Sequence, residues 1–258
     1  MRLFRYGLGV VAILLATTPL IAHDVWLVPS SFRPAVDELV SVRLFVGHGG
    51  DEEPLPRRPH RIDRFVAVTS TGDVDVMGRP GSDPAGYLRL AEPGAATVVY
   101  RNHATITELG PAKFEAYARE EGLDNVLAYR AAHGEEERPG RERYRRFLKS
   151  LLWVGETGEW SDRSVGLDLE LVVDELSHDE LSLRLYAQGE PVTDALIDLW
   201  PLGQNVARAV RTDASGRARF SIGSGAWVAS AIVARRAVDD PEVDWSTAFT
   251  TLSFGVDP

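Results

Sequence analysis

Cysteine is absent from the 258 residues of this chain. Its absence excludes disulfides, so the stability of the fold must come from packed apolar cores. It also excludes thiolate-ligated zinc, iron-sulfur clusters and a cysteine-linked lipid anchor. Any metal site must therefore use histidine, carboxylates or the amino terminus.

Recognisable catalytic motifs are also lacking. The sequence has no Gly-x-Ser-x-Gly elbow, no Walker loop, no His-Glu-x-x-His helix and no Rossmann fingerprint. Basic residues are outnumbered, with 28 Lys and Arg against 38 Asp and Glu, for a formal net charge of −10. An excess of negative charge argues against a nucleic-acid partner. We therefore predict a non-catalytic protein that does not bind nucleic acid.

The first 22 residues have the pattern of a secretory signal. Arg2 and Arg5 precede an uncharged apolar run, and the first acidic residue is Asp24. Cleavage after Ala22 would make His23 the first residue and export the protein to the periplasm. Loss of two arginines would lower the formal charge from −10 to −12. An uncleaved anchor is the alternative, because Leu20 is larger than the small residue usual two places before such a cut.

Strand-like runs dominate both ends of the remaining chain. Residues 25–32 and 39–46 begin a series of short apolar runs separated by Gly, Pro and charged turns, and the even-numbered positions of 39–46 should be buried. This pattern predicts an N-terminal β domain over residues 23–110. From Gly166, seven further runs predict a C-terminal β-sandwich over residues 166–258.

The periodicity changes between these two regions. Pro111 stands at a helix-start position, Gly122 would divide the following helical pattern in two, and residues 140–155 would form a third helix. We therefore expect a mainly β protein in which two β-sandwich domains flank a small helical insert, residues 111–155.

His23 is the first candidate metal ligand. As an amino-terminal residue it would offer its α-amino group and its imidazole Nδ1 to one cation, closing a six-membered chelate. Both groups lose their protons near neutral pH, with reference pKa values of about 7.7–8.0 and about 6.5. Nickel, cobalt, copper and zinc all accept such nitrogen ligands. Asp24 could add an oxygen, or its side chain could point away along a strand.

Two further histidines could complete the site. His48 lies between two glycines at a strand end, where bare backbone permits close approach of a ligand. His103 lies at another strand end and is the candidate third ligand. The alternative for each is an exposed loop histidine without a ligand.

The chain resembles a known family. The segments "AHDVWLVPSSFRP", "VRLFVGHGGDEEPLPR", "VVYRNHATITELGPAKFEAYAREEGL" and "DWSTAFTTLSF" are similar to a bacterial family of unknown function described as the periplasmic component of ABC-type cobalt/nickel uptake systems. The resemblance implies an exported, metal-associated, β-rich protein of a kind sometimes found with energy-coupling nickel or cobalt transporters. His23 and His48 match histidines of the family. At the position of a further family histidine this chain has Val233, which cannot bind a metal, so the family's site does not carry over in full.

The C-terminal region carries a second resemblance. "PVTDALIDLW" followed by "TDASGRARFSI" is similar to transthyretin-like or carboxypeptidase-regulatory-like sandwich modules, with residues 213–216 as the hairpin turn. Such modules are usually structural, so this resemblance implies that the chemistry lies in the N-terminal half.

The sequence thus predicts a periplasmic accessory protein that captures a divalent transition metal through His23 and His48, with His103 and Asp24 as further ligands, and releases it to a transporter. Two rival functions remain open. One is an envelope binding or scaffold module without metal, since a sandwich fold implies no function by itself. The other is a copper monooxygenase that uses His23 as a histidine brace.

Overall fold

The computed structural model describes residues 24–47, 52–155, 162–204 and 206–257. The predicted signal peptide, residues 1–22, lies outside these residues, as do His23 and His48. Within the described part, the chain forms three β-sheets and two α-helices, and apolar clusters fill the spaces between the sheets. The predicted mainly β class with sandwich packing is confirmed.

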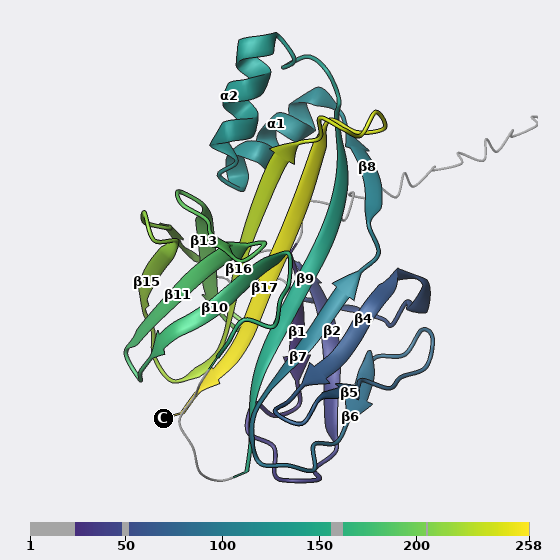
Figure 1. Cartoon of the computed structure of the whole chain (residues 1–258), viewed down its shortest axis with the longest axis vertical. Helices are drawn as coiled ribbons and strands as arrows, with labels where there is room; N and C mark the ends of the chain where they lie inside the picture. Colours follow the sequence, from purple (N-terminus) through teal and green to yellow (C-terminus); the bar gives the residue numbers. More distant parts are fainter. Residues whose placement is uncertain (1–23, 48–51, 156–161, 205, 258) are drawn as a thin grey trace, which may run out of the picture.

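A central sheet organises the described structure (Figure 1). Its strands follow the order β14-β13-β16-β17-β9-β7-β4-β5, with β8 paired to the start of β9. It contains strands from both predicted β domains. The bounds are β4 Ile62–Val68, β5 Asp73–Asp75, β7 Gly94–Asn102, β8 Thr105–Leu109, β9 Gly140–Val154, β13 Leu196–Pro201, β14 Arg208–Arg211, β16 Gly225–Arg236 and β17 Trp245–Val256.

An N-terminal sheet packs against one face of the central sheet. It consists of β1 Asp24–Pro29, β2 Val40–Gly47, β3 Glu53–Leu55 and β6 Gly86–Leu88, and a 3₁₀ turn spans Pro59–Arg61. The even-numbered residues of β2, among them Val42 and Leu44, are buried as predicted. They form a core with β4, β7 and β9. Val25 is tied to β17, where the Thr251 hydroxyl donates to its carbonyl at 2.8 Å.

A C-terminal sheet covers part of the opposite face. Its strands are β10 Leu169–Leu176, β11 Glu180–Ala187, β12 Glu190–Pro191 and β15 Arg217–Ser221. Leu171 and Leu183 from this sheet share a core with Leu252 and Phe254 of β17. The central sheet is therefore buried between two others over much of its area.

The helices pack on the same face as the N-terminal sheet, at the upper end of β16, β17 and β9 (Figure 1). Helix α1 is Pro111–Glu120 and α2 is Asp124–His133. Pro111 begins the first helix, and Gly122, with a φ of +64°, separates the two, as predicted. Within the described residues, no helix has the length and apolar character needed to cross a membrane.

The predicted third helix is wrong, because residues 140–154 form strand β9. Phe147 and Leu151 point into the core beneath the C-terminal sheet, whereas Leu148 and Leu152 point into the core beneath the N-terminal sheet. A strand buried on both faces loses the alternation of apolar and polar residues by which strands are usually identified. Its long apolar run therefore resembled a helix.

The turn at residues 213–216 was predicted only in part. Gly216 has a φ of +75°, and the Asp213 carboxylate accepts hydrogen bonds from Ser215 and Arg217, as expected of a tight turn. However, β14 before the turn pairs with β13, and β15 after it pairs with β11. The turn thus carries the chain from the central sheet to the C-terminal sheet and does not close a hairpin.

A buried ion network lies between the central and C-terminal sheets. The Lys149 ammonium of β9 lies 2.9 Å from Glu170 and 3.1 Å from Asp162, and all three side chains are almost completely buried. Glu170 also accepts hydrogen bonds from the Ser164 hydroxyl and the Val165 amide. Because each charge has a partner, the network can lie within an apolar core.

A second buried carboxylate lies beneath α1. Glu142 of β9 is fully buried, and its Oε1 accepts hydrogen bonds from the Thr247 hydroxyl at 2.6 Å and the Tyr117 hydroxyl at 3.4 Å. Its Oε2 has no hydrogen-bond partner in the described part of the chain. Burial raises the pKa of Glu142 to about 7, even though both hydrogen bonds act to lower it.

Lys149→Met should destabilise the protein by about 3–5 kcal/mol, because it leaves two buried carboxylates without their counter-ion. The free energy of unfolding is measured by urea denaturation. Lys113→Met is the matched control, since Lys113 is the only other lysine and lies exposed on α1. Equal stability of the two variants would contradict the role assigned to the network.

Glu142→Gln should become progressively more stable than the wild type as the pH rises. The folded state holds the Glu142 proton up to about pH 7, whereas an unfolded glutamate loses it near pH 4.3. The wild type therefore loses stability as pH rises through this window, by up to about 3 kcal/mol, and glutamine loses none. Urea denaturation at pH 5 and pH 8 measures this gain, with Glu137→Gln on the surface as the control. A difference that stays constant between the two pH values would refute the assignment.

Candidate functional site

Asp24 opens strand β1 and lies in the protein interior. The strand alternates, so that Val25 and Leu27 face the N-terminal core while Asp24 and Trp26 face β16 and β13. Asp24 is only 7% exposed, and its Oδ2 accepts a hydrogen bond of 3.2 Å from the Ser230 hydroxyl of β16. The predicted oxygen ligand thus points inward and has a partner in the fold.

The register of β1 and β2 determines which chain segments meet at this end of the sheet. Asp24 pairs with Gly47 in the antiparallel ladder. Asp24 follows His23 in the sequence, and Gly47 precedes His48. Both histidines lie outside the described residues, so the structure tests neither as a ligand. It does bring their immediate chain neighbours together.

Two further carboxylates lie near Asp24. Glu121 caps the end of α1 and is 8% exposed, and Asp198 lies on β13 opposite Ser230. Burial, together with the negative charges of Asp24 and Asp198, raises the pKa of Glu121 well above its usual range. We call Asp24, Glu121 and Asp198 the acidic cluster.

Arg146 of β9 supplies positive charge beside this cluster. Its guanidinium lies 4.4 Å from the centre of the Phe249 ring, and its backbone amide donates to Asn102 at 2.6 Å. Burial lowers the pKa of Arg146, whereas nearby groups including Asp24 and Glu121 act to raise it. The cluster is therefore partly neutralised from within the protein.

The acidic cluster alone is not a metal site. Within residues 24–47, 52–155, 162–204 and 206–257, no three His, Asp or Glu side chains are arranged to hold one metal ion. A metal at this end of β1 would need ligands from outside the described residues. The cluster could then supply negative charge close to the ion.

His103 lies at the surface and is not part of the acidic cluster. It follows β7, and its side chain is 59% exposed, with Nδ1 4.0 Å from Asp63 Oδ1. Its backbone amide donates to the Arg61 carbonyl. Its role as a third ligand stays a prediction.

Position 233 lies on the opposite face of β16 from Asp24. Ser230 and Ile232 point toward β1 and the helices, whereas Ala231 and Val233 point toward the C-terminal sheet. A histidine at position 233 would therefore not approach Asp24. In this chain, Ser230 is the β16 residue that contacts the start of β1.

A small cavity of about 160 Å³ lies beside the start of β1. Arg58, Arg61 and Arg146 contribute positive charge to its wall, and Tyr100 and Asn102 also line it. The negative charge of the acidic cluster thus favours a cation nearby, whereas the three arginines of this cavity disfavour one within it.

Sequence reasoning did not identify Glu121 or Asp198, although each carried a signal. Glu121 lies at the carboxyl end of a helix, where the helix dipole disfavours negative charge. Asp198 interrupts the apolar strand "LIDLW". Carboxylates in such unfavourable places often indicate a tertiary partner or a function.

Comparison with known proteins identifies a family but not a function. No curated protein matches the chain. A solved structure, a segment of two fibronectin type III domains from chicken tenascin, aligns with 89% of this chain and 97% of its own at 11% identity, with a TM-score of 0.25. That score is too low to bear on fold or function. The family described as "Domain of unknown function (DUF4198)" matches residues 20–235. This match covers most of the sequence, and the chain therefore belongs to that family.

Proposed function

We propose that this protein binds a divalent transition-metal ion at the amino end of β1, in the periplasm, and delivers it to a membrane transporter. His23 supplies its α-amino group and imidazole, and His48 supplies a second imidazole. Nickel or cobalt is the proposed metal because of the family resemblance, and nitrogen ligands alone would also accept copper or zinc. The protein itself catalyses no reaction.

The pairing of Asp24 with Gly47 is the observation that carries this proposal. Each member of this cross-strand pair adjoins one candidate ligand in the sequence. His23 and His48 are those two residues. The pairing thus supports a shared site for two ligands that are 25 positions apart in the sequence.

The acidic cluster gives secondary support. Asp24, Glu121 and Asp198 gather negative charge around the first described residue of β1, which follows His23 in the sequence, and Arg146 adds positive charge near them. A divalent cation nearby would reduce the mutual repulsion of these carboxylates. Asp24 is proposed to act through its charge, because Ser230 already donates to its carboxylate.

His23→Ala and His48→Ala should each weaken metal binding at least about tenfold, as expected for loss of a direct ligand. The measurement is a competition titration of the exported protein with nickel, cobalt, copper and zinc, with native mass spectrometry to establish the amino terminus and the metal stoichiometry. His178→Ala is the control, because this side chain is 82% exposed in a turn of the C-terminal sheet. His103→Ala in the same titration tests the third ligand.

A variant with one alanine inserted before His23 separates the chelate from a simple imidazole site. The insertion leaves both imidazoles in place but removes the α-amino group from His23. We expect a loss of affinity comparable to that of His23→Ala. Unchanged affinity in both histidine variants would refute the metal site and favour a scaffold role, whereas reductant-dependent oxygen consumption with bound copper would favour a monooxygenase.

A further inference from the structure

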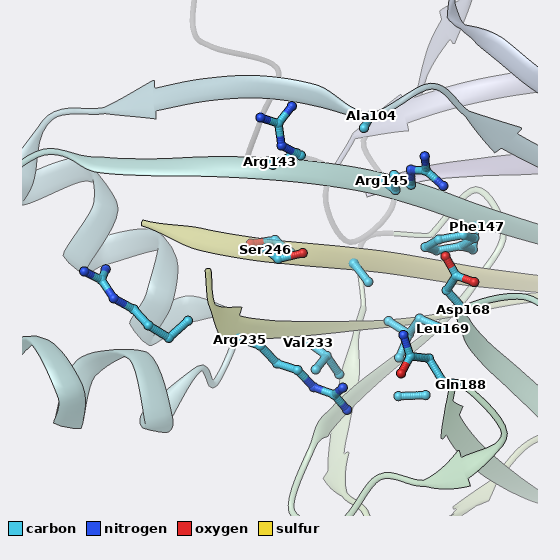
Figure 2. A pocket seen from close by; sticks show the side chains of 14 residues that line it. Ala104, Arg143, Arg145, Phe147, Asp168, Leu169, Gln188, Val233, Arg235 and Ser246 are labelled. Atoms are coloured by element: carbon cyan, nitrogen blue, oxygen red, sulfur yellow. The ribbon is translucent and has the colours of Figure 1, made fainter. Parts of the chain in front are cut away.

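A groove of about 500 Å³ lies on the face of the central sheet opposite the helices (Figure 2). Strands β9, β17 and β16 form its floor, and the ends of β10 and β11 border it through Asp168, Leu169 and Gln188. Its volume falls within the range of small-molecule sites, about 300–1,000 Å³. It is separated by the central sheet from the acidic cluster.

The strand register determines which side chains face the groove. Arg143, Ser246 and Arg235 form one row across β9, β17 and β16, and Arg145, Ala248 and Val233 form the next. Small or apolar side chains thus lie along the middle, and arginines stand on both sides (Figure 2). Because neighbouring strands are about 4.8 Å apart, the backbones that carry the two sets of arginines are separated by about 10 Å.

Two of these arginines have no partner within the described part of the chain. The side chains of Arg145 and Arg235 are exposed and take part in no ion pair or hydrogen bond there. Arg143, in contrast, is paired with Asp240 at 2.6 Å and with Glu242 at 2.8 Å. The groove therefore presents two uncompensated positive charges in a protein of net charge −10.

The remaining polar groups suit a ligand that carries separated negative groups. Gln188 and Ser246 can donate hydrogen bonds to such a ligand, whereas the Asp168 carboxylate, which also lines the groove, disfavours an anionic group beside it. Val233, Ala248 and Phe147 provide apolar contact between the arginines. Guanidinium groups bind carboxylates through two parallel hydrogen bonds, a geometry that lysine cannot provide.

We propose that this groove binds a small organic dicarboxylate. One carboxylate is held by Arg145 and the other by Arg235, and the carbon chain lies over Ala248 and Val233. This inference does not depend on the proposed metal site, because the groove uses none of its residues and lies on the face of β16 opposite the acidic cluster.

Isothermal titration calorimetry with adipate and with glutarate, two dicarboxylates of different length, tests the proposal, and adipamide serves as the uncharged analogue of adipate. We expect saturable binding of at least one of the two anions, with a Kd below about 1 mM, and none of adipamide. Binding should weaken at least about tenfold in Arg145→Gln and in Arg235→Gln, as expected when a charge-assisted pair is lost. Arg219→Gln, an exposed arginine on β15, should bind like the wild type.

Amide NMR shifts during the titration locate the ligand, and shifts centred on Ser246 and Ala248 would support the groove. Equal binding by adipate and adipamide would refute carboxylate recognition. Binding that is unchanged in both groove variants, or absent for both anions, would refute the site. Metal titration of the same variants should give the wild-type affinity, so that failure of either proposal can be recognised separately.

Discussion

The burial of β9 on both of its faces is the constraint on which the rest of the structure depends. Phe147 and Leu151 enter the core with the C-terminal sheet, and Leu148 and Leu152 enter the core with the N-terminal sheet. One strand therefore belongs to two sandwiches at once. A shift of β9 by a single residue would exchange its two faces and disrupt both cores.

The same constraint governs where charge can lie. Along β9, Glu142 and Lys149 are charged positions within otherwise buried surroundings, and each has hydrogen-bond partners from other elements. On β16, Ser230 faces the acidic cluster, whereas Arg235 faces the groove on the other side. The pleat of one strand thus separates a negative region from a positive one by the thickness of the sheet.

Local sequence signals predicted the structure correctly where a single residue determines where a helix begins or ends. Pro111 begins a helix because its ring fixes φ and its missing amide needs no partner there, and Gly122 ends one because it tolerates a positive φ. The buried face of β2 was predicted correctly because apolar residues alternate with polar residues along most of this segment. Strand β9 could not be identified in this way, because burial on both faces removes the alternation that distinguishes strands.

Of the acidic cluster, only Asp24 could be predicted from the sequence. Asp24 was identified by its position beside His23, and its inward orientation depends on Ser230, more than 200 residues away. Glu121 and Asp198 join it from a helix end and from another strand. Their proximity depends on long-range packing, which no short sequence window contains. The basic groove was missed for the same reason, because its arginines come from β9 and β16.

The parallel pairing of β9 with β17 also affects how the chain reaches its folded state. Glu142 lies opposite Trp245, so about 100 residues must be ordered or looped out before this ladder can form. Contacts between such distant segments form slowly, and until they do, the facing edges of β9 and β17 offer unpaired backbone groups to other chains. The central sheet that separates the two candidate sites is thus completed late, and partly folded molecules are the form most exposed to aggregation.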